Sequence, residues 1–121
     1  MMRKPRHWSR SGRIALAAAL FAAFGMSGIA AADDVPTINV TIQNHRFTPS
    51  EIQVPAGQPV ILHIQNNDAT VEEFDSSALQ VEKVIVGGAY GNVRLRPLGP
   101  GRYPFMGEYH PDTAQGVVVS Q

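Results

Sequence analysis

The sequence predicts an all-β sandwich, and three observations support this prediction. Apolar and polar residues alternate with a period of two in several short segments. Pro, Gly and Asn separate these segments at regular intervals. About seven such segments fit into roughly 90 residues, which is the spacing expected of short strands joined by tight turns.

The first half of the expected domain supplies three strands. Thr37–Gln43 is the clearest, because its Ile and Val residues face one way and its Thr, Asn and Gln residues face the other. A short strand is expected at Glu51–Val54 and a longer one at Pro59–Gln65. Pro55–Gln58 separates them as a tight turn, in which Pro fixes φ and Gly can adopt a positive φ.

The second half is expected to begin with an acidic loop, Val71–Asp75, and a short helical turn at Ser76–Gln80. Four further strands are then predicted from β-branched runs and alternation: Val81–Val86, Asn92–Leu98, Tyr103–Phe105 and Gly116–Ser120. The whole pattern favours an antiparallel sandwich.

The N-terminal part has the features of a secretory signal peptide. Five of the ten basic residues lie in the first 13 positions, and the apolar run Ile14–Phe24 follows them. Small residues come next, with Ala30 and Ala32 at the spacing that an export peptidase requires. We therefore expect residues 1–32 to be a signal peptide, residues 33–121 to form one domain, and the mature protein to be periplasmic.

The charge of the expected mature domain argues against nucleic-acid binding. Residues 33–121 hold five basic and ten acidic side chains, so 5 − 10 gives a net charge of −5. An acidic domain repels nucleic acid and attracts cations. The chain has no cysteine, which excludes both a disulfide framework and a thiolate metal site.

Several residues in the second half could bind a metal ion. Carboxylates with an imidazole suit iron, manganese, zinc or oxidised copper, whereas a thioether suits reduced copper. An acidic stretch on an exported domain is more often simply a solvated surface. The candidates are Glu72, Glu73, Asp75, Glu82, Met106, Glu108, His110 and Asp112, together with His45 after the first strand.

The order of several short motifs resembles the cupredoxin-like domains of bacterial periplasmic iron-uptake systems, the EfeO-type group. The resemblance extends over nearly all of residues 37–120. The matching motifs are Arg46–Pro49, Val54–Gly57, Glu72–Ser76, Glu82–Val84, Pro97–Phe105, Gly107–His110 and Thr113–Gly116.

This resemblance implies a cupredoxin-like Greek-key β-sandwich with a metal site at one end. In copper-carrying members one histidine comes from a mid-chain loop, and a cysteine and a second histidine come from the last loop. Glu72 or Glu73 stands near the first histidine's position, Gly107 at the cysteine position and His110 at the second histidine. Gly107 cannot supply the thiolate of a blue-copper centre, so we do not expect a blue-copper carrier.

Strand alternation sets a condition on this site. Along a strand from Tyr103, residues Phe105 and Gly107 share one face, while Met106, Glu108 and His110 share the other. Glu108 and His110 can reach inward only if the chain turns after Gly107, which Gly107 itself permits.

The leading hypothesis is a metal-binding protein of iron acquisition that holds an iron or copper ion. Its role is open between oxidising ferrous iron, passing an electron and delivering the ion to a permease. The expected partners are a membrane iron permease and a periplasmic iron-binding protein. The first-rank ligands are Glu73, Glu82, Glu108 and His110, and the second-rank ligands are Glu72, Asp75, Met106 and His45.

Two other functions remain open at this point. A copper carrier or copper-resistance protein would use Met106, His110 and His45 as ligands. A metal-free interaction module would dock against a permease or a periplasmic partner and need none of them.

Overall fold

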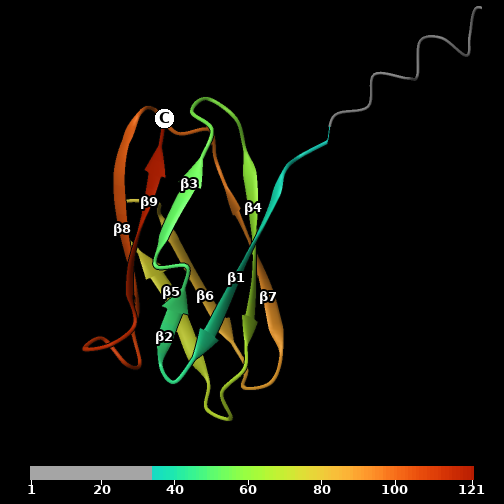
Figure 1. Cartoon of the computed structure of the whole chain (residues 1–121), viewed down its shortest axis with the longest axis vertical. Coiled ribbons are helices and arrows are strands. Elements are labelled where there is room, and N and C mark those ends of the chain that lie inside the picture. Colours follow the sequence, from blue (N-terminus) through green and yellow to red (C-terminus); the bar gives the residue numbers. More distant parts are fainter. Residues whose placement is uncertain (1–33) are drawn as a thin grey trace, which may run out of the picture. The chain divides into compact units, whose positions relative to one another are not determined.

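A computed structural model describes residues 34–121, which form nine strands in two sheets (Figure 1). The predicted signal peptide lies outside the described residues. Within residues 34–121 there is no helix with the length and hydrophobicity needed to span a membrane. The strands are β1 (Thr37–Gln43), β2 (Arg46–Thr48), β3 (Glu51–Val54), β4 (Val60–Asn66), β5 (Glu72–Ser76), β6 (Val81–Ile85), β7 (Tyr90–Leu95), β8 (Gly101–Gly107) and β9 (Gln115–Ser120).

The two sheets have the strand orders β2-β1-β4-β7 and β3-β9-β8-β5-β6. Two neighbouring pairs, β1 with β4 and β3 with β9, are parallel, and the others are antiparallel. The expectation of an antiparallel sandwich is therefore correct for five of the seven strand pairs and wrong for these two. The reason is that β3 crosses to the second sheet, so that β4 returns beside β1 in the same direction.

The core lies between the sheets and comes from the inward residues of each alternating strand. In β4 the burial alternates strictly along the strand, and in β7 every second residue is buried. Phe47 makes edge-to-face contacts with Phe74 and Phe105, with ring centroids 5.9 and 5.0 Å apart. Such contacts between buried aromatic rings add to the free energy gained from burying their area.

Two segments differ from the sequence prediction. Val71–Asp75 was expected to be a loop, but β5 occupies Glu72–Ser76 and lies inside the second sheet between β8 and β6. Its alternation of buried Glu72, Phe74 and Ser76 with half-buried residues is that of a strand. The segment was predicted to be a loop because three of its five residues are acidic, although Phe74 and its neighbours follow the alternation of a strand. The short strand β2 was also not predicted; the predicted turn after Ser76 is present.

Asn66 organises the end of the sandwich that carries the connections β1–β2, β4–β5, β6–β7 and β8–β9 (Figure 1). Its side chain is fully buried. Its amide nitrogen donates to the carbonyls of Thr70 (2.9 Å) and Ile85 (3.1 Å), and its Oδ1 accepts the backbone N–H of Asp68 (3.0 Å). These bonds fix the loop that leads into β5.

We expect Asn66→Ala to lower the free energy of unfolding by about 2–3 kcal/mol, because it leaves buried carbonyl groups without donors. Chemical denaturation monitored by circular dichroism measures this. The neighbour Asn67 is exposed, and its side chain makes no hydrogen bond to another residue of 34–121, so Asn67→Ala should change the value by less than about 0.5 kcal/mol. Equal losses in the two variants would show that Asn66 does not have this role.

Candidate metal centre and acidic face

Glu72 opens β5 and points inward, where its side chain is only 2% exposed. A buried carboxylate is costly unless hydrogen-bond donors surround it. Oε1 accepts the backbone N–H groups of Glu73 (3.0 Å) and Tyr109 (2.9 Å). Oε2 lies 2.6 Å from Nδ1 of His110. The tautomer of His110 that carries a proton on Nδ1 can donate to this oxygen.

The chain turns directly after β8, which brings His110 to Glu72. The N–H of Gly107 donates to the carbonyl of Ala114 (2.8 Å), and the N–H of His110 donates to the carbonyl of Gly107 (3.1 Å). Gly107 also faces Glu72 directly. A Cβ at this position would lie 2.6 Å from Cδ of Glu72 and 2.7 Å from Cβ of Ala114, so no side chain fits there.

His45 stacks on His110, with ring centroids 3.6 Å apart and an angle of 13° between the planes. It occupies the two-residue turn between β1 and β2, where Asn44 and His45 have φ values of 53° and 57°. Both φ values are positive, as a two-residue hairpin turn of type I′ requires. Oδ1 and Oδ2 of Asp68 accept the N–H groups of Asn44 (2.8 Å) and His45 (2.9 Å). The bond from His45 is the main reason why the pKa of Asp68 lies below its usual value.

We call Glu72, Gly107, His110 and His45 the His–Glu cluster. It joins three segments that are distant in the sequence: the start of β5, the end of β8 with the turn that follows it, and the β1–β2 turn. Asp68, which the sequence analysis missed, holds the β1–β2 turn in place. The only sequence signal for Asp68 was its place in a polar turn after a strand, which does not identify a partner 23 residues away.

Four other carboxylates lie on the outer face of the second sheet. Asp75 stands opposite Glu82 in the pairing of β5 with β6. Glu73 faces the same way as Asp75, and the backbone N–H of Glu108 donates to the carbonyl of Glu73 (2.9 Å). Within residues 34–121, none of the four forms an ion pair with Lys or Arg. We call Glu73, Asp75, Glu82 and Glu108 the acidic face.

Repulsion and hydrogen bonding within the acidic face change the protonation of Glu73. A side-chain hydrogen bond with Glu108 raises the pKa of Glu73 from 4.5 to about 7, with smaller contributions from desolvation and from the charges of Glu108, Glu82 and Asp75. The surroundings of Glu73 therefore favour its protonated form.

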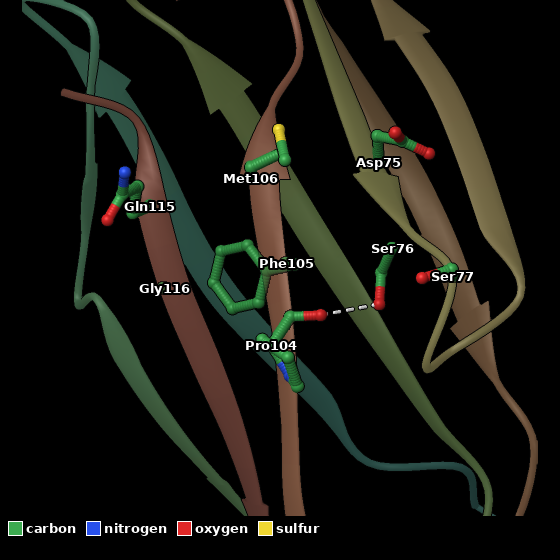
Figure 2. A pocket seen from close by; sticks show the side chains of 8 residues that line it. All are labelled: Asp75, Ser76, Ser77, Pro104, Phe105, Met106, Gln115 and Gly116. Atoms are coloured by element: carbon green, nitrogen blue, oxygen red, sulfur yellow. Dashed lines mark hydrogen bonds between the residues drawn. The ribbon is translucent and has the colours of Figure 1, made fainter. Parts of the chain in front are cut away.

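Met106 lies beside the acidic face and not beside the histidines. It stands opposite Asp75 in the pairing of β5 with β8, with 41% of its surface exposed. Both line a hollow of about 320 Å³, and Figure 2 shows their side chains among those of its other lining residues. There β5 and β8 are bridged by the Ser76 hydroxyl, which donates to the Pro104 carbonyl (2.6 Å). No histidine lines this hollow.

The first-rank ligand candidates are thus divided between two places. Glu73, Glu82 and Glu108 lie on the acidic face, whereas His110 is bound to Glu72 in the His–Glu cluster. Of the second-rank candidates, Asp75 and Met106 belong to the outer face, and Glu72 and His45 belong to the cluster. In the part of the chain that the structure describes, no three His, Asp or Glu side chains are arranged to hold one ion.

The comparisons with known proteins agree with this architecture. A family model described as a cupredoxin-like domain matches residues 16–120. The chain belongs to this cupredoxin-like family. An uncharacterised Rickettsia prowazekii protein, RP394, is 39% identical over 87 residues, which cover 72% of this chain and 70% of that protein. The predicted cupredoxin-like β-sandwich is confirmed.

Solved copper proteins share the cupredoxin fold at low sequence identity. Auracyanin A, a blue copper protein from Chloroflexus aurantiacus, is 17% identical with a TM-score of 0.61, and the match covers 73% of this chain and all of that one. The metal-binding domain of the Streptococcus pneumoniae D39 Cu(I)-exporting ATPase CopA, solved with Cu(I), is 15% identical with a TM-score of 0.63. That match covers 76% of this chain and 91% of that one.

The His–Glu cluster does not fit a cupredoxin copper ion. The chain has no cysteine and therefore no thiolate ligand. Nδ1 of His110 is already bound to the carboxylate of Glu72. The same carboxylate occupies the space that a side chain at position 107 would need. His45 cannot compensate, because the lone pairs of two stacked imidazoles lie in parallel planes and cannot meet at one ion.

The raised pKa of Glu73 predicts that stability falls as pH rises. The folded protein keeps a proton that the unfolded chain releases near pH 4.5, so the contribution is complete below that pH and is lost through about pH 7. Thermal unfolding in chelator between pH 5 and pH 8 measures this decline, which Glu73→Gln should reduce. A variant with the pH profile of the wild type would contradict the assignment to Glu73.

Proposed function

We propose that this chain is an exported, periplasmic protein that binds a metal cation on its acidic face and acts in iron acquisition. One observation supports the proposal above the others: four carboxylates from adjacent segments gather on one face, and no Lys or Arg neutralises them in the described domain. Such a group lowers its own repulsion by binding a cation.

The donor type favours a hard ion. Carboxylate oxygens suit iron, manganese or oxidised copper better than reduced copper, which prefers sulfur. The proton that Glu73 retains up to about pH 7 occupies a position that a cation can take over. Because no three ligating side chains of residues 34–121 are already arranged around one point, those of the acidic face must rotate to enclose an ion. An open arrangement of this kind suits an ion that is captured and passed on, which makes iron a cargo of the protein.

The resemblance to EfeO-type iron-uptake domains supplies the biological context of the proposal. It favours a membrane iron permease as the receiver of the ion and a periplasmic iron-binding protein as a second partner. Oxidising ferrous iron would also require an electron acceptor, either a copper ion or a partner protein. Capture and delivery need neither, so they are the role that the acidic face supports best.

The copper-carrier alternative has less support from the geometry. It requires Met106, His110 and His45 to converge, but Met106 lies on the outer face opposite Asp75 while the two imidazoles stack in the His–Glu cluster. The relatives with copper in their names share the fold at under 20% identity, and a likeness of that kind carries no ligand set over to this chain.

Titration calorimetry of chelator-treated protein, with anaerobic ferrous iron and with copper in both oxidation states, tests the proposal. Glu73→Gln combined with Glu108→Gln should weaken iron binding at least about tenfold, because half of the carboxylates on the face lose their charge. Glu51→Gln is the matched control: this exposed glutamate lies on the opposite edge strand of the same sheet and pairs with Arg102.

Two results would contradict the proposal. Binding that Met106→Ala abolishes and Glu73→Gln leaves intact would favour the copper carrier. A wild-type protein that takes up no metal at all would favour the metal-free interaction module.

A further inference from the structure

Glu72 holds two separate segments together at one end of the sandwich. Its own strand, β5, supplies one N–H donor, and the turn after β8 supplies the N–H of Tyr109 and the imidazole of His110. A metal ion bound by side chains of the same segments would link them in the same way. A metal ion would make this link as a cation, by accepting lone pairs from its ligands. The Glu72 carboxylate makes it as an acceptor of hydrogen bonds from N–H groups.

The space beside Gly107 is filled by the same carboxylate. A Cβ at position 107 would meet Cδ of Glu72 at 2.6 Å and Oε2 at 2.8 Å, distances that real Cβ atoms do not show. Cβ of Ala114, at 2.7 Å, is the other obstacle, so Glu72 and Ala114 together leave no room for a side chain at position 107. A larger residue at position 107 and a glutamate at position 72 exclude each other.

We infer that the Glu72 carboxylate takes the place of the cupredoxin copper ion, and that this end of the sandwich is built to stay closed without metal. The inference is independent of the proposed function, because the acidic face lies on the outside of the sheet and shares no side chain with the His–Glu cluster. His110 is then a structural partner of Glu72, and His45 completes the closure by stacking on its outer ring face.

A double-mutant cycle in chelator tests the steric part of the inference. Gly107→Ala should lower the melting temperature by about 10 °C, because the new methyl group overlaps Glu72. Glu72→Ala should also lower it, because the buried donors lose their acceptor. The double variant should melt higher than Gly107→Ala, because removing the Glu72 carboxylate relieves one of the two overlaps and leaves only that with Cβ of Ala114. Losses that simply add in the double variant would overturn the inference.

Copper binding tests the replacement itself. The wild-type protein should have the same melting temperature with equimolar Cu(I) as with chelator. If copper does shift the melting temperature, the double variant Glu73→Gln with Glu108→Gln should abolish the shift, and His110→Ala should leave it unchanged. A stabilisation by copper that depends on His110 and not on the acidic face would overturn the inference. Because the readouts depend on different residues, failure here leaves the proposed function untouched, and the reverse also holds.

A gain-of-function variant gives the positive test. Glu72→His with Gly107→Cys removes the carboxylate and provides a thiolate and a second imidazole beside His110. With Cu(II) it should develop an intense visible thiolate-to-copper absorption, whereas Gly107→Cys alone should not, because Glu72 still fills the space and holds His110. A double variant that is folded by circular dichroism and stays colourless would show that Glu72 does not mark the copper position.

Discussion

The contact between Glu72 and His110 is the interaction on which this end of the molecule depends. A carboxylate that is almost fully buried must find donors, and here the donors come from β5 and from the turn that follows β8. The short turn after Gly107 brings both the N–H of Tyr109 and the ring of His110 to this carboxylate, and the absence of a side chain at position 107 leaves room for it. His45 and Asp68 then extend the same network to the β1–β2 turn.

The register of one strand separates the two chemical regions of the domain. Glu72 and Glu73 are neighbours in sequence, but in β5 they point to opposite faces of the sheet. Glu72 is therefore enclosed and satisfied, whereas Glu73 is half-exposed and shares its surroundings with three other carboxylates. A shift of one residue in the pairing of β5 with β8 would exchange these roles.

A fold known from copper proteins therefore supports a different chemistry in this chain. The sandwich is that of the cupredoxin-like family, but the chain has no cysteine and His110 is hydrogen-bonded to Glu72. The scaffold remains useful because its rigid sheets hold side chains at fixed positions on either face. In this protein the inward-facing Glu72 closes one end of the sandwich, and the outward-facing Glu73 belongs to the acidic face.

The sequence by itself determined the β-sandwich class, most of the strands and the exclusion of a thiolate site, because alternation, turn residues and composition are local properties. It also placed Phe105 and Gly107 on one face and Met106 on the other, as the structure confirms. It could not assign Val71–Asp75 correctly, because the pairing of β5 with β6 and β8 outweighed its acidic composition.

Only the tertiary structure decided which acidic residue meets His110. Glu72 and His110 are 38 residues apart, and His45 and His110 are still more distant, so no periodicity relates them. Their contact follows from strand pairing across the sheet and from a turn whose direction depends on the space left by Gly107. The sequence identified the candidates, and packing divided them between a closed interior and a charged surface.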